Sequence, residues 1–362
     1  MRRWLFLFAI TVIFAGPEQE DLSRTPFSLS WSVGRCVACR FATRLETIQF
    51  TNGRNGWAIG DAWPPAGAEG LGERVVVHTL DGGRTWKELP FTHMHAASPV
   101  VWFLNNANGW ICWGTPLGEF KLARTLDEGK TWLDVPGTFE WSSLFLDDTN
   151  WYGVDGGIFL RTRDAGRTWS RTELPLVRGV DRVFFLSPEI GWIAGSVNDH
   201  SIVLRTVDGG RDWEDGGGAI PGRMGKVQDL FFLSPTHGWL IASRSPEIGS
   251  DLFATMDGGR TWTRVQDSLL QGSHMSASMV RFISESTGFV FRTEERAECP
   301  GCSPRKLADS RNDMVSTSDG GVHWHRQTIP HTINDCQVFE GDLRCSAGSG
   351  HPGFLLLRVH PN

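Results

Sequence analysis

TLDGGRTW at residues 79–86 is the first of six copies of one pattern, T-x-D-x-G-x-[TDH]-W, here called the box. The other copies are TLDEGKTW (125–132), TRDAGRTW (162–169), TVDGGRDW (206–213), TMDGGRTW (255–262) and TSDGGVHW (317–324). Their aspartates are Asp81, Asp127, Asp164, Asp208, Asp257 and Asp319. Each carboxylate can accept backbone N–H groups of its own turn, and the glycine supplies a positive φ. A residue repeated six times is architectural, so we exclude these aspartates as catalysts.

A second element precedes every box and completes a repeating unit. It is Gly-Trp or a close variant, at Gly56-Trp57, Gly109-Trp110, Asn150-Trp151, Gly191-Trp192, Gly238-Trp239 and Gly288-Phe289. Seven residues before each of these aromatics stands Phe50, Phe103, Leu144, Phe185, Phe232 or Phe282. Each unit therefore contains four short apolar runs bounded by turn residues, which indicate strands. Four antiparallel strands per unit are typical of a β-propeller blade.

The two ends of the chain supply one further unit. Its first three strands are Cys336–Phe339, Leu343–Gly348 and Phe354–Val359. Phe27–Val33 provides the missing outer strand, with Trp31 in the place of the box tryptophan. The sequence therefore predicts an all-β, seven-bladed β-propeller of four-stranded antiparallel blades, closed by the N-terminal strand in the last blade, which removes an exposed sheet edge. The alternative is six blades, with residues 331–362 as an appendage.

The boxes resemble the Asp-box, or bacterial neuraminidase (BNR), repeat over nearly all of the chain from Phe27 onward. The unit that combines GWAIG (56–60) with TLDGGRTW also resembles the photosystem II stability/assembly factor family, and GWIAG (191–195) with TVDGGRDW is the next closest unit. That resemblance implies an exported seven-bladed propeller that acts as a non-catalytic binding scaffold or assembly/stability factor. It implies a fold and a binding mode, without a photosynthetic role. The long loop with CPGC at 299–302 departs from the family's usual unit.

A more distant resemblance to the sialidase superfamily supplies the alternative function, a glycoside hydrolase of the sialidase/xyloglucanase-like Asp-box class acting on a carbohydrate. Sialidases use a tyrosine nucleophile, an arginine triad and an Arg-Ile-Pro motif. This chain has no Arg-Ile-Pro, and its one tyrosine, Tyr152, falls in a core position of the third unit. A glycosidase needs two carboxylates flanking the scissile bond, and the sequence selects no such pair. We therefore favour the scaffold over the enzyme.

In Asp-box propellers the binding face of the disc is opposite the boxes, so the resemblance implies a site there. The first residue of each inner strand should lie on that face, at the mouth of the central channel. The candidate binding residues are Glu46, Glu140, Asp181 and Gln228. Their acids could bind a cation, an amine or a sugar, or form a solvated rim. Two insertions, Asp61–Glu73 and Thr293–Asn312, are expected on the same face.

Seven cysteines suggest cross-links. Two CxxC pairs are Cys36 with Cys39 and Cys299 with Cys302. Both are expected on one face, where four cysteines would have the ligand spacing of a tetrahedral structural zinc site. We favour disulfides over this zinc site, which is the alternative, because export favours disulfides, and Cys336 and Cys345 fall on adjacent strands. Three bridges would leave Cys112 as a buried free thiol. No other cofactor is predicted.

Composition and the N-terminal sequence indicate the class of partner and the compartment of the protein. Lys and Arg total 35 and Asp and Glu total 41, and the resulting net charge of −6 argues against nucleic acid. Arg2 and Arg3 precede an apolar run at 4–15 that is too short to span a bilayer and matches a secretory signal. We expect a signal peptide or N-terminal anchor over 1–16 and one β-propeller domain over 17–362. The expected protein is an exported monomer, periplasmic or extracellular, without a transmembrane domain in the mature chain, and its partner is a protein or a carbohydrate.

Overall fold

The structure is a computed structural model in which every regular element of the described residues is a strand. It describes residues 27–37, 42–63, 73–91, 97–114, 120–139, 144–155, 157–175, 179–197, 200–215, 220–221, 225–245, 249–266, 275–294, 311–347 and 354–361. The strands are numbered β1 to β28. Across these ranges no helix has the length and apolar character needed to cross a bilayer. The expected all-β class is confirmed.

Five antiparallel sheets are each built from four consecutive strands. Two of them contain β6 (Ala97–Phe103), β7 (Gly109–Gly114), β8 (Phe120–Thr125) and β9 (Leu133–Phe139), then β10 (Leu144–Phe145), β11 (Trp151–Asp155), β12 (Ile158–Thr162) and β13 (Ser170–Glu173). The next two contain β14 (Gly179–Phe185), β15 (Gly191–Val197), β16 (His200–Thr206) and β17 (Glu214–Asp215), then β18 (Val227–Phe232), β19 (Gly238–Ser245), β20 (Gly249–Thr255) and β21 (Thr263–Arg264). The last contains β22 (Met275–Phe282), β23 (Gly288–Glu294), β24 (Arg311–Thr317) and β25 (His325–Ile329).

An eight-stranded sheet unites the two ends of the chain, in the order β2-β3-β4-β5-β1-β28-β27-β26. Its strands are β2 (Ala42–Phe50), β3 (Gly56–Trp63), β4 (Glu73–Thr79), β5 (Thr85–Leu89), β1 (Phe27–Val37), β28 (Phe354–Pro361), β27 (Asp342–Ala347) and β26 (Ile333–Phe339). β1 runs antiparallel to β28 from Phe27 to Gly34 and then parallel to β5 from Arg35 to Val37.

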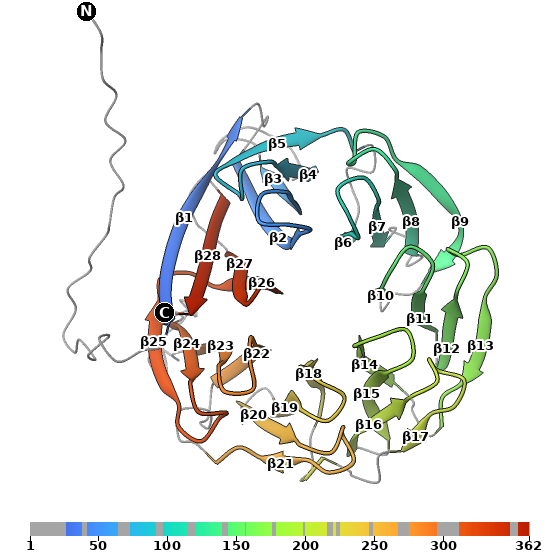
Figure 1. The fold of residues 1–362 in the computed structure, drawn as a ribbon, viewed down its shortest axis with the longest axis vertical. Coiled ribbons are helices and arrows are strands. Elements are labelled where there is room, and N and C mark those ends of the chain that lie inside the picture. Colours follow the sequence, from blue (N-terminus) through green and yellow to red (C-terminus); the bar gives the residue numbers. More distant parts are fainter. Residues whose placement is uncertain are drawn as a thin grey trace, which may run out of the picture.

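The described strands thus form seven groups of four, here called blades one to seven, around a ring (Figure 1). Blade one is β2 to β5, and blade seven is β26, β27, β28 and β1. The propeller fold and the closing role of Phe27–Val33 follow the sequence prediction. The alternative with residues 331–362 as an appendage is wrong, because β26, β27 and β28 share a sheet with β1.

The box forms a hydrogen-bonded turn between the third and fourth strands of a blade. In the first box the Thr79 hydroxyl and the Thr85 amide both donate to Oδ1 of Asp81 at 2.9 Å, and the Thr85 hydroxyl donates to Oδ2 at 2.6 Å. The Gly83 amide donates to the Thr79 hydroxyl oxygen at 2.9 Å. Gly82 and Gly83 have φ values of 75° and 91°, which glycine adopts without steric cost. The aspartate therefore closes its own turn.

Two boxes carry a different residue at the position of Thr85. In the fourth box this residue is Asp212, whose amide donates to Asp208 Oδ1 at 3.1 Å. In the sixth box it is His323, whose Nδ1 lies 2.7 Å from Asp319 Oδ2. The backbone bond to the aspartate persists in both, so the turn tolerates the change.

At four joints, adjacent blades are connected by stacked aromatic rings. The second-strand aromatic of one blade lies on the inner-strand phenylalanine of the next. The stacked pairs, with ring-centroid distances, are Trp57 on Phe103 (3.9 Å), Tyr152 on Phe185 (3.9 Å), Trp192 on Phe232 (3.6 Å) and Trp239 on Phe282 (3.5 Å). The preceding glycine is needed because a Cβ on Gly56 would lie 2.5 Å from the Phe50 ring. The glycine thus makes room for the phenylalanine of its own blade, and the aromatic that follows it reaches the next blade.

The third blade departs by one residue from the predicted alignment. The sequence matched Trp151 to the repeated tryptophan and Leu144 to the phenylalanine. In the structure Trp151 pairs with Phe145, as Gly109 pairs with Phe103 in blade two. Trp151 therefore stands at the glycine position, and the next residue takes the tryptophan position.

The turn between β10 and β11 explains this shift. The Leu146 amide donates to the Asn150 carbonyl at 3.1 Å, and in blade two the Leu104 amide donates to the Asn108 carbonyl at 3.0 Å. Because the turn ends at Asn150, Tyr152 is the residue that reaches the next blade. The prediction that Tyr152 lies in the core is confirmed, since its exposed fraction is 0%.

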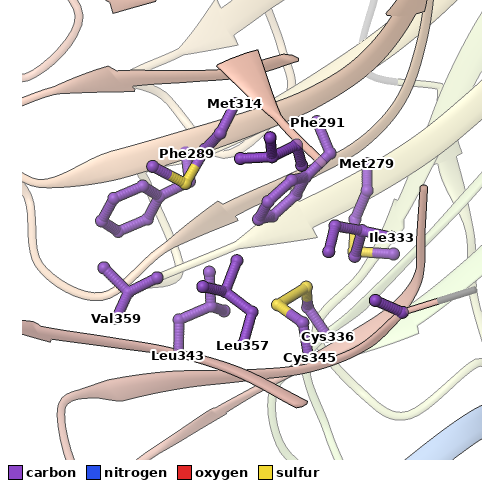
Figure 2. Packing of buried hydrophobic residues seen from close by; sticks show 12 residues of the cluster. Met279, Phe289, Phe291, Met314, Ile333, Cys336, Leu343, Cys345, Leu357 and Val359 are labelled. Atoms are coloured by element: carbon purple, nitrogen blue, oxygen red, sulfur yellow. A yellow bond between two sulfur atoms is a disulfide. The ribbon is translucent and has the colours of Figure 1, made fainter. Parts of the chain in front are cut away.

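Blades six and seven enclose an apolar cluster beside the closing strand (Figure 2). Met279, Phe291 and Met314 of blade six face Leu343 and Leu357 of blade seven, and all five are buried. Trp31 and Leu29 of β1 pack against the same cluster while partly exposed. The outer strand is therefore attached both by its ladder to β28 and by these two apolar side chains.

Replacing Trp31 with alanine should weaken ring closure. We expect a loss of about 1–2 kcal/mol in the free energy of unfolding, because a half-buried aromatic gives up part of its transfer free energy. Val33 on the same strand is the matched control, since it is 68% exposed and its replacement by alanine should cost under about 0.5 kcal/mol. Urea unfolding of both variants measures the difference, and equal losses would contradict the packing role of Trp31.

Acid should destabilise the fold through its boxes. Hydrogen bonds lower the pKa of all six box aspartates below 3.8; for Asp164, donation by the Thr168 hydroxyl is the largest cause and the pKa is about 2. A depressed folded-state pKa gives stability that is complete above pH 4 and is lost as the pH falls from about 4 to about 2.

Two partly buried carboxyls titrate in the opposite sense. Burial raises the pKa of Asp181 and of Asp335, so acidification relieves the cost of burying their charges. Urea midpoints between pH 5 and pH 2 should fall less steeply in Asp164→Asn and more steeply in Asp335→Asn than in the parent. A parent midpoint that does not change with pH over this range would refute the assignment.

Candidate functional site

The described residues of the predicted channel mouth occupy equivalent places on three inner strands. Glu46 on β2, Asp181 on β14 and Gln228 on β18 are each the extra residue of a β-bulge. A bulge re-aims a side chain out of the regular ladder. Glu140 lies outside the described residues. The predicted residues thus share one structural position in three different blades.

Two of these mouth residues already have structural partners. Glu46 forms an ion pair with Arg74 at 2.8 Å. Asp181 accepts a hydrogen bond from the Val227 amide of the next blade at 3.0 Å. Both carboxylates therefore support neighbouring strands.

Other inner-strand carboxylates that the sequence analysis missed also bridge blades. Asp229 Oδ2 accepts from the Val280 amide at 2.8 Å and from the Arg281 guanidinium at 2.6 Å. Asp335 Oδ2 accepts from the Ile48 amide at 3.1 Å, across the joint between blades seven and one. The available signal was a polar residue inside an otherwise apolar inner-strand run. These side chains hold the ring together around its channel.

Two glutamines do the same with both ends of their amides. Gln49 Nε2 donates to the Phe103 carbonyl at 2.8 Å, and its Oε1 accepts from the Phe103 amide. Gln337 makes the same pair of bonds with Phe50, at 3.0 and 2.5 Å. Phe103 is thus fixed by backbone hydrogen bonds as well as by its stack on Trp57, and Phe50 by hydrogen bonds and by the Arg344 guanidinium over its ring.

The structure describes the side chains of some of the cysteines. Cys336 and Cys345 form a disulfide, and Cys112 is a buried free thiol whose pKa is raised to about 12 by burial. Cys36 belongs to β1, opposite Trp86 of β5, and its side chain lies outside the described residues, as do Cys39, Cys299 and Cys302. Within the described part of the chain no three His, Cys, Asp or Glu residues gather as a metal site.

A positively charged pocket of about 330 Å³ lies between blade three and the fourth box. Its walls come from β12, β13 and the third and fourth boxes. The lining residues are Arg161, Arg163, Thr168, Ser170, Thr172, Gly210 and Arg211. Three guanidinium groups and three hydroxyls thus line the pocket, and no carboxylate is among its lining residues. Such a lining favours an anion with several acceptor oxygens.

Arg161 is the fixed part of this lining. Its exposed fraction is 5%, and it donates only to backbone carbonyls of blade four, at 2.6 Å to Gly209 and at 3.2 Å to both Asp208 and Pro188. Its Nε is buried without a partner. Burial lowers the pKa of Arg161, but a guanidinium stays charged in proteins. The joint therefore holds a buried positive charge whose hydrogen bonds all go to backbone carbonyls, while Glu189 acts on it through its charge without a hydrogen bond among these contacts.

Arg161 makes these contacts because blade three carries Tyr152 where blade four carries Trp192. In blade four, Nε1 of Trp192 donates to the carbonyl of Gly258 in the next box at 2.8 Å. Gly209 is the equivalent residue of the fourth box, but a tyrosine has no indole N–H, and Tyr152 donates to the Pro188 carbonyl at 3.1 Å. Arg161 takes the place of the missing indole donor. A neutral contact has thus been replaced by a charged one.

A sequence signal for this arrangement existed. An arginine stands directly before the box threonine in three consecutive units, as Arg124, Arg161 and Arg205. The sequence analysis placed the binding face opposite the boxes, whereas this pocket lies beside them. The exposed Arg163 and Arg211 belong to the boxes themselves, which were set aside as architecture.

Tyr152 is unsuited to the nucleophilic role of a sialidase tyrosine. Its side chain is stacked on Phe185 and fully buried. Burial raises its pKa to about 12. A phenol in this position has neither access to a substrate nor a lowered pKa.

Comparison with solved structures supports the β-propeller fold. No protein-family model and no curated protein matches the chain. Similar solved structures include "YCF48 bound to D1 peptide" (16% identity, 94% of this chain and 97% of that chain, TM-score 0.62) and YCF48 from Cyanidioschyzon merolae (16%, 91% and 98%, 0.60). A GH74 xyloglucanase from Xanthomonas campestris matches at 15% identity over 89% of this chain and 53% of its own, with a TM-score of 0.58. At these identities the likeness shows the fold, and the predicted resemblance is confirmed at that level.

We expect no hydrolysis of a fluorogenic sialoside by the purified protein. Tyr152→Phe should only remove the hydrogen bond to Pro188, at a cost of about 1 kcal/mol in unfolding free energy. Fluorescence release and urea unfolding check the two statements. Sialoside hydrolysis that Tyr152→Phe abolishes would contradict them.

Proposed function

We propose that this chain is an exported, non-catalytic binding propeller that holds an extended acidic segment of a partner protein, as an assembly or stability factor does. The observation that carries the proposal is the pocket around Arg161, Arg163 and Arg211. A carboxylate of the partner would supply the negative charge that Arg161 lacks. The hydroxyls of Thr168 and Ser170 already donate to Asp164 and to the Arg161 carbonyl, so the three guanidinium groups are the donors for the ligand. Because the whole chain carries a net charge of −6, this local positive site determines where on the protein an anion binds.

The structural neighbours support a protein partner. One of them is described as bound to a D1 peptide. We carry over from it only that a propeller of this fold holds a peptide, and we assign no photosynthetic role. The shared fold alone does not identify a partner. The arginine pocket gives this chain a chemical reason of its own to bind one.

The disulfide supports export. Cys336 and Cys345 are joined in blade seven, and such bonds persist in oxidising compartments outside the cytosol. We therefore keep the proposal of a periplasmic or extracellular monomer, with residues 1–16 as its signal or anchor and 17–362 as one domain. The channel mouth and the four-cysteine zinc site stay predictions.

A carbohydrate hydrolase is the less favoured function. The GH74 neighbour shares the fold, but Glu46 and Asp181 are both engaged with neighbouring groups. Two free carboxylates facing each other are what a glycosidase requires. We therefore do not assign hydrolysis to the channel mouth.

Neutralising the two exposed arginines should weaken acidic-peptide binding. The probe is a fluorescein-labelled hexaglutamate peptide, measured by anisotropy at low and at physiological salt. We expect each of Arg163→Gln and Arg211→Gln to raise Kd about threefold to tenfold, because each removes one partly exposed charge pair. Added salt should weaken parent binding in the same direction.

Arg171→Gln is the matched control. Arg171 lies on β13 between the pocket residues Ser170 and Thr172, is exposed and does not line the pocket. Its replacement removes the same charge from the same strand, and Kd should stay within about twofold of the parent. Equal weakening in all three variants would mean that the peptide senses net charge only. Tight hexaglutamate binding that no variant affects would refute the pocket.

A further inference from the structure

The disulfide of blade seven lies at a sealed joint between two blades. The exposed fractions of Cys336 and Cys345 are 5% and 0%. Figure 2 shows the bond within the apolar cluster that blade six shares with blade seven. Met279 and Phe291 of blade six belong to this cluster. An oxidant or a reductant must touch the sulfur that it attacks, so neither reaches these atoms while the two blades are packed.

The hairpin that carries the bond is a local structure. Cys336 and Cys345 are directly opposite on β26 and β27, nine residues apart, with a Cα–Cα distance of 4.1 Å. Glu340 and Gly341 connect the strands with φ values of 51° and 81°, as in the two-residue turns typical of tight hairpins. Nothing from blade six is needed to bring the two sulfurs together.

We propose that the disulfide forms in the free β26–β27 hairpin before blade seven packs against blade six, and that packing then protects the bond. The oxidant is a disulfide of the glutathione class or the disulfide of a thiol oxidoreductase, acting on the hairpin before blade seven packs against blade six. The native ring is a substrate for neither oxidation nor reduction at this site. The inference does not depend on the arginine pocket.

The chemistry balances with such an oxidant. The Cys336 thiolate attacks oxidised glutathione, a mixed disulfide forms and one glutathione thiolate leaves. The Cys345 thiolate then attacks the Cys336 sulfur, the protein disulfide forms and the second glutathione leaves. Two electrons pass from the cysteines to glutathione, and the two thiol protons end on the two released glutathiones.

The order of events can be tested by timed oxidation of the full chain. The reduced, denatured protein is diluted into refolding buffer, and oxidised glutathione is added either at once or after folding is complete. Alkylation followed by peptide mapping measures the 336–345 disulfide without interference from the other cysteines. We expect late oxidation to be at least about 100-fold slower, because blade seven must first open. Comparable rates for early and late addition would overturn the proposal.

Cys112 is the internal control for folding. It is a buried thiol in blade two, so its protection from alkylation reports whether the ring has formed. A reduced chain that leaves Cys112 reactive has not folded, and this result also supports oxidation before closure. In the converse experiment, dithiothreitol should reduce the bond of the native protein at least about 100-fold more slowly than that of the protein in guanidinium. Equally fast reduction of the native protein would refute protection by packing.

Discussion

The stack of an aromatic ring on a phenylalanine of the next blade is the interaction that recurs between blades, at four joints of the ring. Trp57 on Phe103 is typical, with parallel rings 3.9 Å apart. Such a pair contributes about 0.5–1.5 kcal/mol beyond the burial of its area, and it fixes the height of each blade against its neighbour. Nε1 of Trp57 also donates to the carbonyl of Glu128 in the second box at 3.0 Å. One side chain thus joins the second strand of a blade to the inner strand and the box of the next.

The candidate site follows from a change in that contact. Tyr152 keeps the stack but loses the indole donor, and Arg161 supplies the hydrogen bond to Gly209 in its place. A guanidinium brings a charge that the indole did not have, and burying a charge without a hydrogen-bonded counter-ion is costly. An anionic ligand would remove part of that cost, which is the physical basis of the proposed binding at blade three.

The sequence predicted the features that depend on residues close together in the chain. Thr79, Asp81 and Thr85 lie within seven residues, so their hydrogen bonds repeat wherever the pattern repeats, and the strands beside them could be placed. The register of blade three could not be found in this way, because a turn that ends at Asn150 fixes it and Trp151 imitates the repeated tryptophan. The contact of Arg161 with a box 48 residues later depends on the packing of blades. In the sequence, the recurring Arg-Thr dipeptide was the signal for this contact.

An arginine donates to the equivalent box carbonyl at two joints of the ring, and these joints differ in the outer strand beside them. At the joint between blades seven and one, Arg358 donates to the carbonyl of Gly82, which is the equivalent residue of the first box. There β1 crosses from one blade to the other, and the Arg35 amide donates to the Arg84 carbonyl at 2.9 Å, so a strand lies over that box. Among the described residues, the outer strand of blade four is β17, Glu214–Asp215, and Arg161 lines a pocket beside it. The same arginine donor thus occurs at two joints that differ in their outer strands: at one it lies where β1 closes the ring, and at the other it lies in the lining of a pocket.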